Sequence, residues 1–334
     1  MLTAFIKYGD GTLSTDTSPE ALSRALRDER AVFWLDMCKP TDEELGYLDD
    51  VFGFHPLAIE DSVQYSQRPK VERYNHVGDI CPTGYFYIVI HGPDLATFRE
   101  KLRTKELDMF LSERFLVTIH EEVMVSVATV LDRARGDPRR VLDAGVDMLV
   151  HSILDHLVDH YEPILDFLGE AIDDLEEEAV IDPKEDILQR ISIKKKELLN
   201  LRRVIGPQRE VIAQLTRGDV PFIRESTRVY FRDVLDHLNR AVENVEIYRD
   251  LVVSARDIYM SSVSNNLNRV MKTLTIITVT ALPLTIITSF YGQNFAIPEF
   301  EWILHHRFGF YVSMTLMLGI AGSLLYIFRR KGWF

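Results

Sequence analysis

Two long stretches near the C-terminal end of the chain, residues 273–298 and 308–328, contain no charged side chain. A helix rises about 1.5 Å per residue, so roughly 20 apolar residues cross a hydrocarbon core of about 30 Å. Both stretches are long enough, and the pattern predicts two transmembrane helices. The first stretch is also rich in threonine, which indicates that one side of it faces a polar environment: Thr273, Thr275, Thr278, Thr280, Thr285 and Thr288.

Short runs of alternating apolar residues characterise residues 1–140 and are typical of strands. They lie at 2–7, 31–36, 85–91, 107–111 and 115–120, and helix-like segments lie near 18–29, 41–52 and 122–135. The segment 78–84, around Cys81-Pro82-Thr83, is expected to form a turn or loop. The pattern predicts an α/β domain.

Helical periodicity replaces the strand pattern beyond Asp137-Pro138. An acidic helix is expected at 141–180 and a basic helix at about 184–216, with Asp182-Pro183 between them, which predicts an antiparallel hairpin. Solvation of both charged faces is the simpler alternative. A third helix is predicted from about Glu225, with no Gly or Pro before Pro283. If unbroken, its roughly 65 residues span on the order of 100 Å.

The predicted organisation has seven parts, from the N-terminus to the C-terminus. They are an α/β domain at 1–140, a charged helical hairpin at 141–220, a stalk helix at 221–271, a first transmembrane helix at 272–291, an external loop at 292–307, a second transmembrane helix at 308–328 and a basic tail at 329–334.

Charge predicts the orientation in the membrane. The formal net charge is -13, and beyond residue 272 the acidic residues are only Glu299 and Glu301. Basic residues flank the spans on the side away from the loop, at Arg269, Lys272, Arg329, Arg330 and Lys331, whereas the loop has only Arg307. By the positive-inside rule, both termini are expected in the cytosol and the chain in the cytoplasmic (inner) membrane. The N-terminus has no basic region followed by an apolar one, so no secretory signal is expected.

Several classes of function are not favoured. Cys38 and Cys81 are too few for a disulfide scaffold and lack the Cys/His spacing of structural zinc. No phosphate-binding Gly-x-x-x-x-Gly-Lys-Ser/Thr motif is present, so no ATP-driven pumping is expected. Hydrolase motifs are missing as well, so we do not expect an enzyme, and the acidic chain is not expected to bind nucleic acid.

Several blocks in order along the chain resemble the CorA-type divalent-cation transporters. The cytosolic blocks are His-Pro-Leu-Ala-Ile-Glu-Asp at 55–61 and Gln-Arg-Pro-Lys-Val-Glu at 67–72. The stalk matches at 230–234 and 265–275, and the membrane end at Pro-Leu-Thr 283–285, Tyr-Gly-Gln-Asn-Phe 291–295 and Pro-Glu 298–299. One residue departs, since the usual Gly-Met-Asn has Gln293 in its middle. The zinc-transporting branch of the family, called ZntB, also varies there.

The resemblance implies a fold and an assembly. The fold is an α+β cytosolic domain, built as an α/β/α sandwich, followed by a long helical stalk and two C-terminal transmembrane helices. The assembly is a funnel-shaped homopentamer in membrane lipid, whose first transmembrane helix lines a pore.

A 3-4 spacing along the first span predicts which residues face that pore. The spacing gives Asn268, Met271, Thr275, Thr278, Leu282, Thr285, Ser289 and Gly292, and Leu274, at the start of the span, is added to the predicted pore-lining residues. Met271 and Leu274 are candidates for a hydrophobic constriction, with helix packing as the alternative role. The alternative for the threonines is that they bond to carbonyls of their own helix and merely tolerate lipid.

The ion entrance is predicted at the outer end of this helix. Mg²⁺ gives up its waters reluctantly, so neutral oxygens of Gly292 and Asn294 suit a hydrated ion, with Tyr291 and Gln293 beside them. Gln293 either adds amide groups or packs. Glu299 and Glu301 would attract cations outside the membrane, or they are ordinary loop residues.

Regulation follows only from the resemblance, which implies that cytosolic Mg²⁺ closes the channel by bridging acidic residues of neighbouring subunits. Asp233 matches the family's stalk aspartate in that role. Its partner carboxylate is not identified, with Asp79 and Asp94 as candidates.

Alternatives remain for the ion and for the class. Mg²⁺ is the expected cargo, with Co²⁺ and Ni²⁺ as further ions. Gln293 and the loop residues His305 and His306 keep Zn²⁺ transport, with proton coupling, as an alternative. His156 and His160 have an i, i+4 spacing that can bind a transition metal, although a solvated or packed helix face is the favoured explanation. A membrane-anchored metal sensor that conducts nothing is the third hypothesis.

Overall fold

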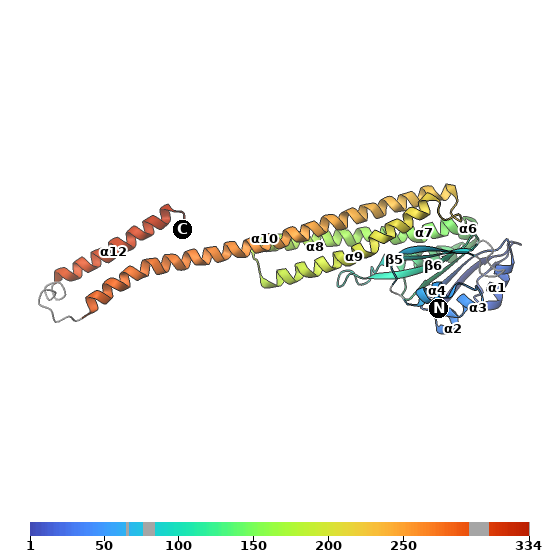
Figure 1. Ribbon diagram of the computed structural model, residues 1–334, viewed down its shortest axis with the longest axis horizontal. Helices are drawn as coiled ribbons and strands as arrows, with labels where there is room; N and C mark the ends of the chain where they lie inside the picture. Colours follow the sequence, from blue (N-terminus) through green and yellow to red (C-terminus); the bar gives the residue numbers. More distant parts are fainter. Residues whose placement is uncertain (65–66, 76–83, 294–306, 334) are drawn as a thin grey trace. The chain divides into compact units, whose positions relative to one another are not determined.

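A computed structural model describes residues 1–64, 67–75, 84–293 and 307–333 (Figure 1). The chain divides into two compact units. The first comprises Met1–Glu178 and Lys184–Arg256, and the second comprises Ala179–Pro183 and Asp257–Phe334.

A seven-stranded sheet forms the framework of the first unit, with the strand order β2-β1-β3-β7-β6-β5-β4. Only β3 and β7 pair in parallel, and the other neighbours are antiparallel. The strands are β1 (Leu2–Lys7), β2 (Leu13–Ser14), β3 (Val32–Cys38), β4 (Lys70–Tyr74), β5 (Tyr85–Pro93), β6 (Thr104–Leu111) and β7 (Phe115–His120).

The predicted strands coincide with β1, β3, β5, β6 and β7, whereas the sequence pattern missed β2 and β4. Both missed strands lie at the edges of the sheet. Strand β2 has two residues, and β4 carries charge at Lys70, Glu72 and Arg73, as edge strands commonly do. Neither strand has the buried alternation by which the central ones are recognised.

Helices cover both faces of the sheet, which confirms the predicted α/β/α sandwich (Figure 1). One face packs on α1 (Pro19–Arg27), α2 (Asp42–Leu45), α3 (Tyr47–Asp50) and α4 (Pro56–Val63). An aromatic cluster fills this side, with ring centroids 4.2 Å apart for Phe54 and Phe110 and 5.2 Å apart for Phe33 and Phe115. Such stacked and buried rings are a main source of core stability.

The other face packs on shorter helices, and here the sequence prediction was wrong. The single helix expected at 141–180 is divided among α6 (Pro138–Asp143), α7 (Val146–Asp159) and α8 (Tyr161–Ile181), preceded by α5 (Val125–Gly136). Gly145 has φ +100°, a conformation that interrupts a helix. The buried Asp147 carboxylate accepts hydrogen bonds from the Arg224 backbone at 3.1 Å and from Arg224 Nε at 2.8 Å, which ties the break to another helix.

Helices α8 and α9 (Glu185–Arg217) are separated by a short link at Pro183. Arg190 pairs with Glu178 across the link. The expected general match of an acidic helix with a basic one is not observed, because other basic residues pair elsewhere: Arg202 Nε lies 2.6 Å from Glu246 Oε1 of the next helix. The pairing is therefore local.

Helix α10 (Glu225–Gly292) is one continuous element of 68 residues that begins where the sequence predicted. Pro283 lies inside it and removes one backbone donor, which leaves the carbonyl of Val279 without its helical partner. After the undescribed segment, α12 (Arg307–Arg330) follows with 24 residues. Both helices are long and apolar enough to cross a membrane.

Candidate functional site

The apolar part of α10 is almost entirely uncovered within the single chain. Leu267, Val270, Ile277 and Ile286 each expose about 60% of their surface. An uncovered apolar surface of this length requires lipid or another protein helix around it. This part of α10 therefore has the length and the exposed apolar surface of a membrane-spanning helix.

The predicted pore-lining residues other than Leu274 lie on α10 at alternating intervals of three and four, and Leu274 directly precedes Thr275. The row from Asn268 to Gly292 spans 24 residues, or about 36 Å of helix, which exceeds a hydrocarbon core of about 30 Å. All members are exposed except Thr275, which is half-buried. One helix therefore presents a continuous row in which the Asn268 amide and four hydroxyls are interrupted by Met271 and Leu282.

The hydroxyl groups of this row bond to their own helix. Thr275 Oγ1 donates to the Met271 carbonyl at 2.7 Å, Thr278 to the Leu274 carbonyl at 2.9 Å, and Thr285 to the Ala281 carbonyl at 3.0 Å. This is the pattern by which threonine is tolerated in lipid. A hydroxyl oxygen that donates its proton still has two lone pairs as acceptors. The row can therefore accept hydrogen bonds from water without breaking the helix.

The outer end of α10 brings Tyr291 and Gly292 into the last helical turn, and the Gln293 N–H donates to the Phe290 carbonyl at 3.4 Å. The other residues predicted for the entrance and the outer loop, Asn294, Glu299, Glu301, His305 and His306, lie outside the described residues.

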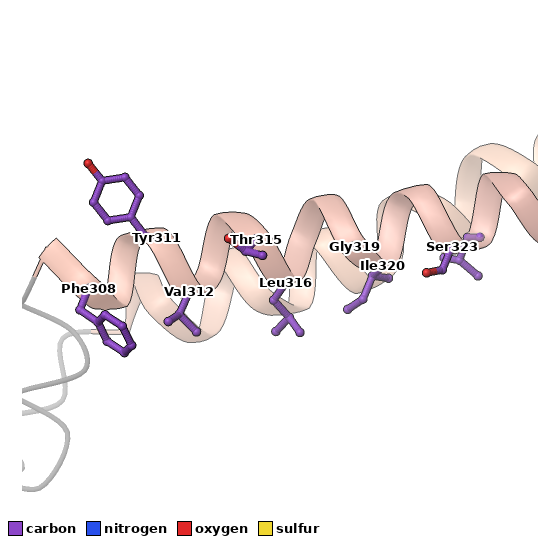
Figure 2. Close-up of a pocket in the computed structure, with 9 residues that line it drawn as sticks. Phe308, Tyr311, Val312, Thr315, Leu316, Gly319, Ile320 and Ser323 are labelled. Carbon is purple, nitrogen blue, oxygen red and sulfur yellow. The ribbon is translucent and has the colours of Figure 1, made fainter.

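Helix α12 presents an apolar surface of a different character. A shallow pocket of about 780 Å³ lies along it. Figure 2 shows Phe308, Val312, Leu316 and Ile320 following one edge of the helix. Thr315, Gly319 and Ser323 recur at intervals of four beside them. Small residues at this interval allow helices to approach closely in a bilayer, whereas the pocket offers a cation only the hydroxyls of Tyr311, Thr315 and Ser323. The oxygen-bearing side chains that repeat along α10 offer a cation more ligands than this surface does.

A group of titratable residues surrounds Asp233 in the first unit. His237 Nδ1 lies 3.2 Å from Asp159 Oδ1, and His237 Nε2 lies 3.8 Å from Asp233 Oδ2. Helix α7 supplies Asp159 and α10 supplies the other two, so the helices bring together residues more than seventy positions apart. The Asp233 side chain is 73% exposed and thus accessible to a hydrated ion.

Asp155, His156 and Asp159 of α7 form a metal-binding arrangement in the same region. One ligand atom of each lies within 4.8 Å of the others. The sequence had paired His156 with His160 instead. Helix α7 ends at Asp159, so no regular helix continues to His160, and His160 is not a member of the group. Burial lowers the pKa of His160, and the neighbouring His156 lowers it further.

Two carboxylates, those of Asp79 and Asp94, were candidates to bind a metal ion together with Asp233, and only one of them lies among the described residues. Asp79 lies outside the described residues. Asp94 is buried and both its oxygens are engaged: Thr97 Oγ1 donates at 2.8 Å, the Ala96 N–H at 3.1 Å and Lys105 Nζ lies at 3.1 Å. Burial alone would raise the pKa of Asp94, but these hydrogen bonds outweigh it and hold the pKa below its ordinary value. Asp94 therefore has little capacity left for a metal ion.

A buried polar pair, which the sequence analysis did not single out, lies between β5 and β6. His91 and Glu106 are cross-strand partners, with His91 Nε2 3.7 Å from Glu106 Oε2. Glu106 Oε2 accepts the Gln67 N–H at 2.9 Å, whereas Glu106 Oε1 has no hydrogen-bond partner among the described residues. Burial raises the pKa of Glu106 to about 7. This carboxyl therefore titrates near neutral pH.

A long apolar helix with a row of polar side chains, and a group of metal-ligating side chains in the first unit, are features expected of a membrane protein that handles metal cations. Comparison with known proteins agrees. The model of the family described as "CorA-like Mg2+ transporter protein" matches residues 29–330. The chain therefore belongs to this family and is a divalent-cation transporter of the CorA type.

Individual relatives match most of the chain. The Thermotoga maritima cobalt/magnesium transport protein CorA is 35% identical over 285 residues, covering 85% of this chain and 78% of its own. A Bacillus subtilis protein named as a metal ion transporter, YfjQ, is 34% identical over 313 residues, covering 94% and 93%. The complete structure of the Methanocaldococcus jannaschii CorA magnesium transporter superposes with a TM-score of 0.79 at 25% identity, covering 99% and 98%.

A more distant relative has a different substrate in its name. The zinc transport protein ZntB of Pectobacterium carotovorum is 24% identical over 228 residues, covering 67% of each chain. Membership in the family therefore does not decide between magnesium and zinc.

Proposed function

We propose that this protein takes up Mg²⁺ across the cytoplasmic membrane through the pore of a homopentamer, with Co²⁺ and Ni²⁺ as further ions. The observation that carries the proposal is the row on α10, where uncharged oxygen-bearing side chains repeat over the full thickness of a bilayer. An anchor helix needs no such row. The names of the Thermotoga and Methanocaldococcus relatives support Mg²⁺ and Co²⁺ as the ions.

The chemistry of the row suits an ion that keeps its waters. Mg²⁺ holds its first hydration shell tightly, so a pathway of neutral acceptors contacts the waters rather than replacing them. Weak contacts of this kind let the ion enter and leave. The ring of Gly292 and Asn294 at the outer end has the same chemistry, and Met271 with Leu274 would close the inner end by excluding water.

Membrane potential supplies the driving force. A divalent ion moving inward gains about 2.3 kcal/mol per charge at 100 mV, or about 4.6 kcal/mol in total. This energy corresponds to more than about a thousandfold accumulation. The orientation predicted by the basic flanks, with both termini in the cytosol, directs this uptake inward.

Regulation by cytosolic Mg²⁺ is assigned to Asp233. The carboxylate is exposed, and His237 connects it to Asp159 and the neighbouring Asp155. Bound Mg²⁺ would neutralise these charges and hold neighbouring subunits together, and its loss would let the acidic faces repel each other. Asp233 and Met271 belong to one continuous helix, α10, so this helix connects the proposed regulatory site with the proposed constriction.

Zinc uptake coupled to protons is the second candidate. Gln293 in place of the family's methionine, together with the similarity to ZntB, favours it. An assay of ion uptake into proteoliposomes separates the candidates, with Mg²⁺, Co²⁺, Ni²⁺ and Zn²⁺ tested in parallel, with and without a proton gradient. The proposal expects potential-driven Mg²⁺ uptake that does not need the gradient. Gradient-dependent Zn²⁺ uptake would favour the second candidate, and metal binding without uptake of any ion would favour a sensor.

A further inference from the structure

A hollow of about 350 Å³ lies in the first unit, beside helix α9. Its lining comes from β5 and β6, from the segments just before β4 and just after β7, and from one turn of α9. All of these residues belong to the first unit, and none of them takes part in the proposed transport pathway. Cavities of roughly 300–1,000 Å³ are the size that proteins use for small-molecule ligands.

Two buried side chains of the lining have unused hydrogen-bonding capacity. His91 and Glu106 are only 9% and 8% exposed, and Glu106 Oε1 and His91 Nδ1 have no hydrogen-bond partner among the described residues. His91 Nε2 lies 2.8 Å from the Gln67 carbonyl, which can only accept, so Nε2 donates and Nδ1 of the neutral ring is an acceptor. Burial lowers the pKa of His91, which keeps the ring neutral near pH 7. Buried polar atoms of this kind cost stability unless water or a ligand satisfies them.

Two arginines of the lining are available to a ligand. Arg68 and Arg203 are exposed, and their side chains form no ion pair or hydrogen bond with any residue that the structure describes. Lys105 differs, because its Nζ lies between Glu122 Oε2 at 3.0 Å and Asp94 Oδ1 at 3.1 Å. The arginines are therefore the basic groups of the hollow that remain open to an anion from outside the chain.

These donors and acceptors match a phosphate group with a hydroxyl-bearing remainder. A guanidinium presents its N–H groups in a planar fork that fits phosphate oxygens. A phosphate ester has three acceptor oxygens, which suffice for Arg68, Arg203 and a protonated Glu106 carboxyl together, whereas a carboxylate has only two. The His91 Nδ1 acceptor suits a hydroxyl group of the same ligand.

We infer that this hollow binds a small phosphate ester that carries hydroxyl groups. The inference does not rest on the proposed transport, since ligand binding is measured without ion flux. Glu121 is the acidic residue of the lining for which the structure shows no partner among the described residues, and it opposes an anion. It therefore gives the test a variant with the opposite sign.

The test is isothermal titration calorimetry of the full-length protein in neutral detergent and Mg²⁺-free buffer. The probe is sn-glycerol 3-phosphate, and glycerol is the uncharged comparison. We expect saturable binding of the phosphate ester and none of glycerol. In Arg68→Gln/Arg203→Gln the affinity should fall at least about tenfold, because hydrogen bonds between charged groups are among the strong ones. In Glu121→Gln the affinity should rise about two- to fivefold, as expected for removal of one exposed like charge.

The matched control is Lys195→Gln/Arg209→Gln, which removes the same charge from exposed positions of α9 outside the hollow. It should change the affinity less than about twofold. Equal losses in the two double variants would show diffuse attraction and overturn the inference, as would the absence of saturable binding at millimolar concentrations. Weaker binding in Glu121→Gln would overturn it in favour of a cationic ligand. Equally tight binding of inorganic phosphate would overturn the ester and assign the hollow to free phosphate.

Discussion

Replacing the buried Glu106 by glutamine should remove a pH-dependent loss of folding free energy from the first unit. The glutamine side chain has nearly the same shape, and its carbonyl oxygen can accept the Gln67 N–H that Glu106 Oε2 accepts at 2.9 Å. The Glu106 side chain is only 5% exposed, so little solvent screens it. The variant therefore changes the titration more than the packing.

The magnitude follows from the pKa of Glu106, which burial raises from its ordinary value of 4.5 to about 7. Gln67 and Lys70 lower this pKa, whereas Asp61 raises it further, and all are present in both proteins. Between these two pH values the folded state keeps a proton that the unfolded state has lost, so stability falls as pH rises. The difference corresponds to about 3 kcal/mol, at about 1.36 kcal/mol for each pH unit.

The assay is thermal unfolding of the full-length protein in detergent at pH 5, 6, 7 and 8. About 1 kcal/mol shifts the Tm of a domain of this size by roughly 2–4 °C. Relative to the parent, the Tm of Glu106→Gln should therefore rise by on the order of 5 to 10 °C between pH 5 and pH 8. His91 titrates in both proteins, so its contribution largely cancels in the difference.

The control is Glu113→Gln, which removes an exposed carboxylate just after β6. Its Tm should follow that of the parent at every pH. A Tm difference between Glu106→Gln and the parent that stays constant from pH 5 to pH 8 would refute the reasoning, because the glutamate would then ionise normally in the fold.

Three further predictions concern regulation, the entrance and the fold. Asp233→Ala should weaken the inhibition of uptake by internal Mg²⁺ at least several-fold in liposomes. The control Asp236→Ala, which replaces another exposed aspartate on the same helix, should leave the inhibition unchanged. Identical inhibition curves for Asp233→Ala and the parent would show that Asp233 is not part of the sensor. Asn294→Ala should abolish Mg²⁺ uptake while size-exclusion chromatography still shows the parent's assembly, and retained uptake would disprove the entrance assignment. Gly145→Ala should lower the free energy of unfolding, measured by denaturant titration, by about 1–3 kcal/mol. The reason is that Gly145 has φ +100° and that an added Cβ would lie 2.6 Å from Arg224 Nη2. Unchanged stability would mean that the loop relaxes freely.

Strong local patterns in the sequence were sufficient to predict the central strands, the start of α10 near Glu225 and the apolar stretches that α10 and α12 contain. The sequence missed β4 because its residues are mostly charged, and it missed the break at Gly145 because helical periodicity continues on both sides of that residue. The Asp147–Arg224 contact beside this glycine joins residues far apart in sequence, which no local pattern indicates.

The residues of the candidate site likewise divide into those that the sequence alone could place and those that it could not. Positions at fixed spacing on one helix, from Asn268 to Gly292, could be placed from the sequence because helix geometry alone relates them. The neighbours of Asp233 could not, since Asp159 reaches His237 only after α7 and α10 pack. The pairing of His91 with Glu106 likewise depends on the register of β5 and β6, which no local pattern gives.

The central claim is that divalent cations move along the row on α10, and substitution of one hydroxyl tests it most directly. Thr278 lies in the row, whereas Thr273 lies about 140° around the helix and makes the same kind of bond, to the Arg269 carbonyl at 3.0 Å. Mg²⁺ uptake into proteoliposomes is measured at an inside-negative potential for Thr278→Val and Thr273→Val. The account predicts a several-fold slower uptake for Thr278→Val and a rate within about twofold of the parent for Thr273→Val. Equal rates in the two variants would contradict it.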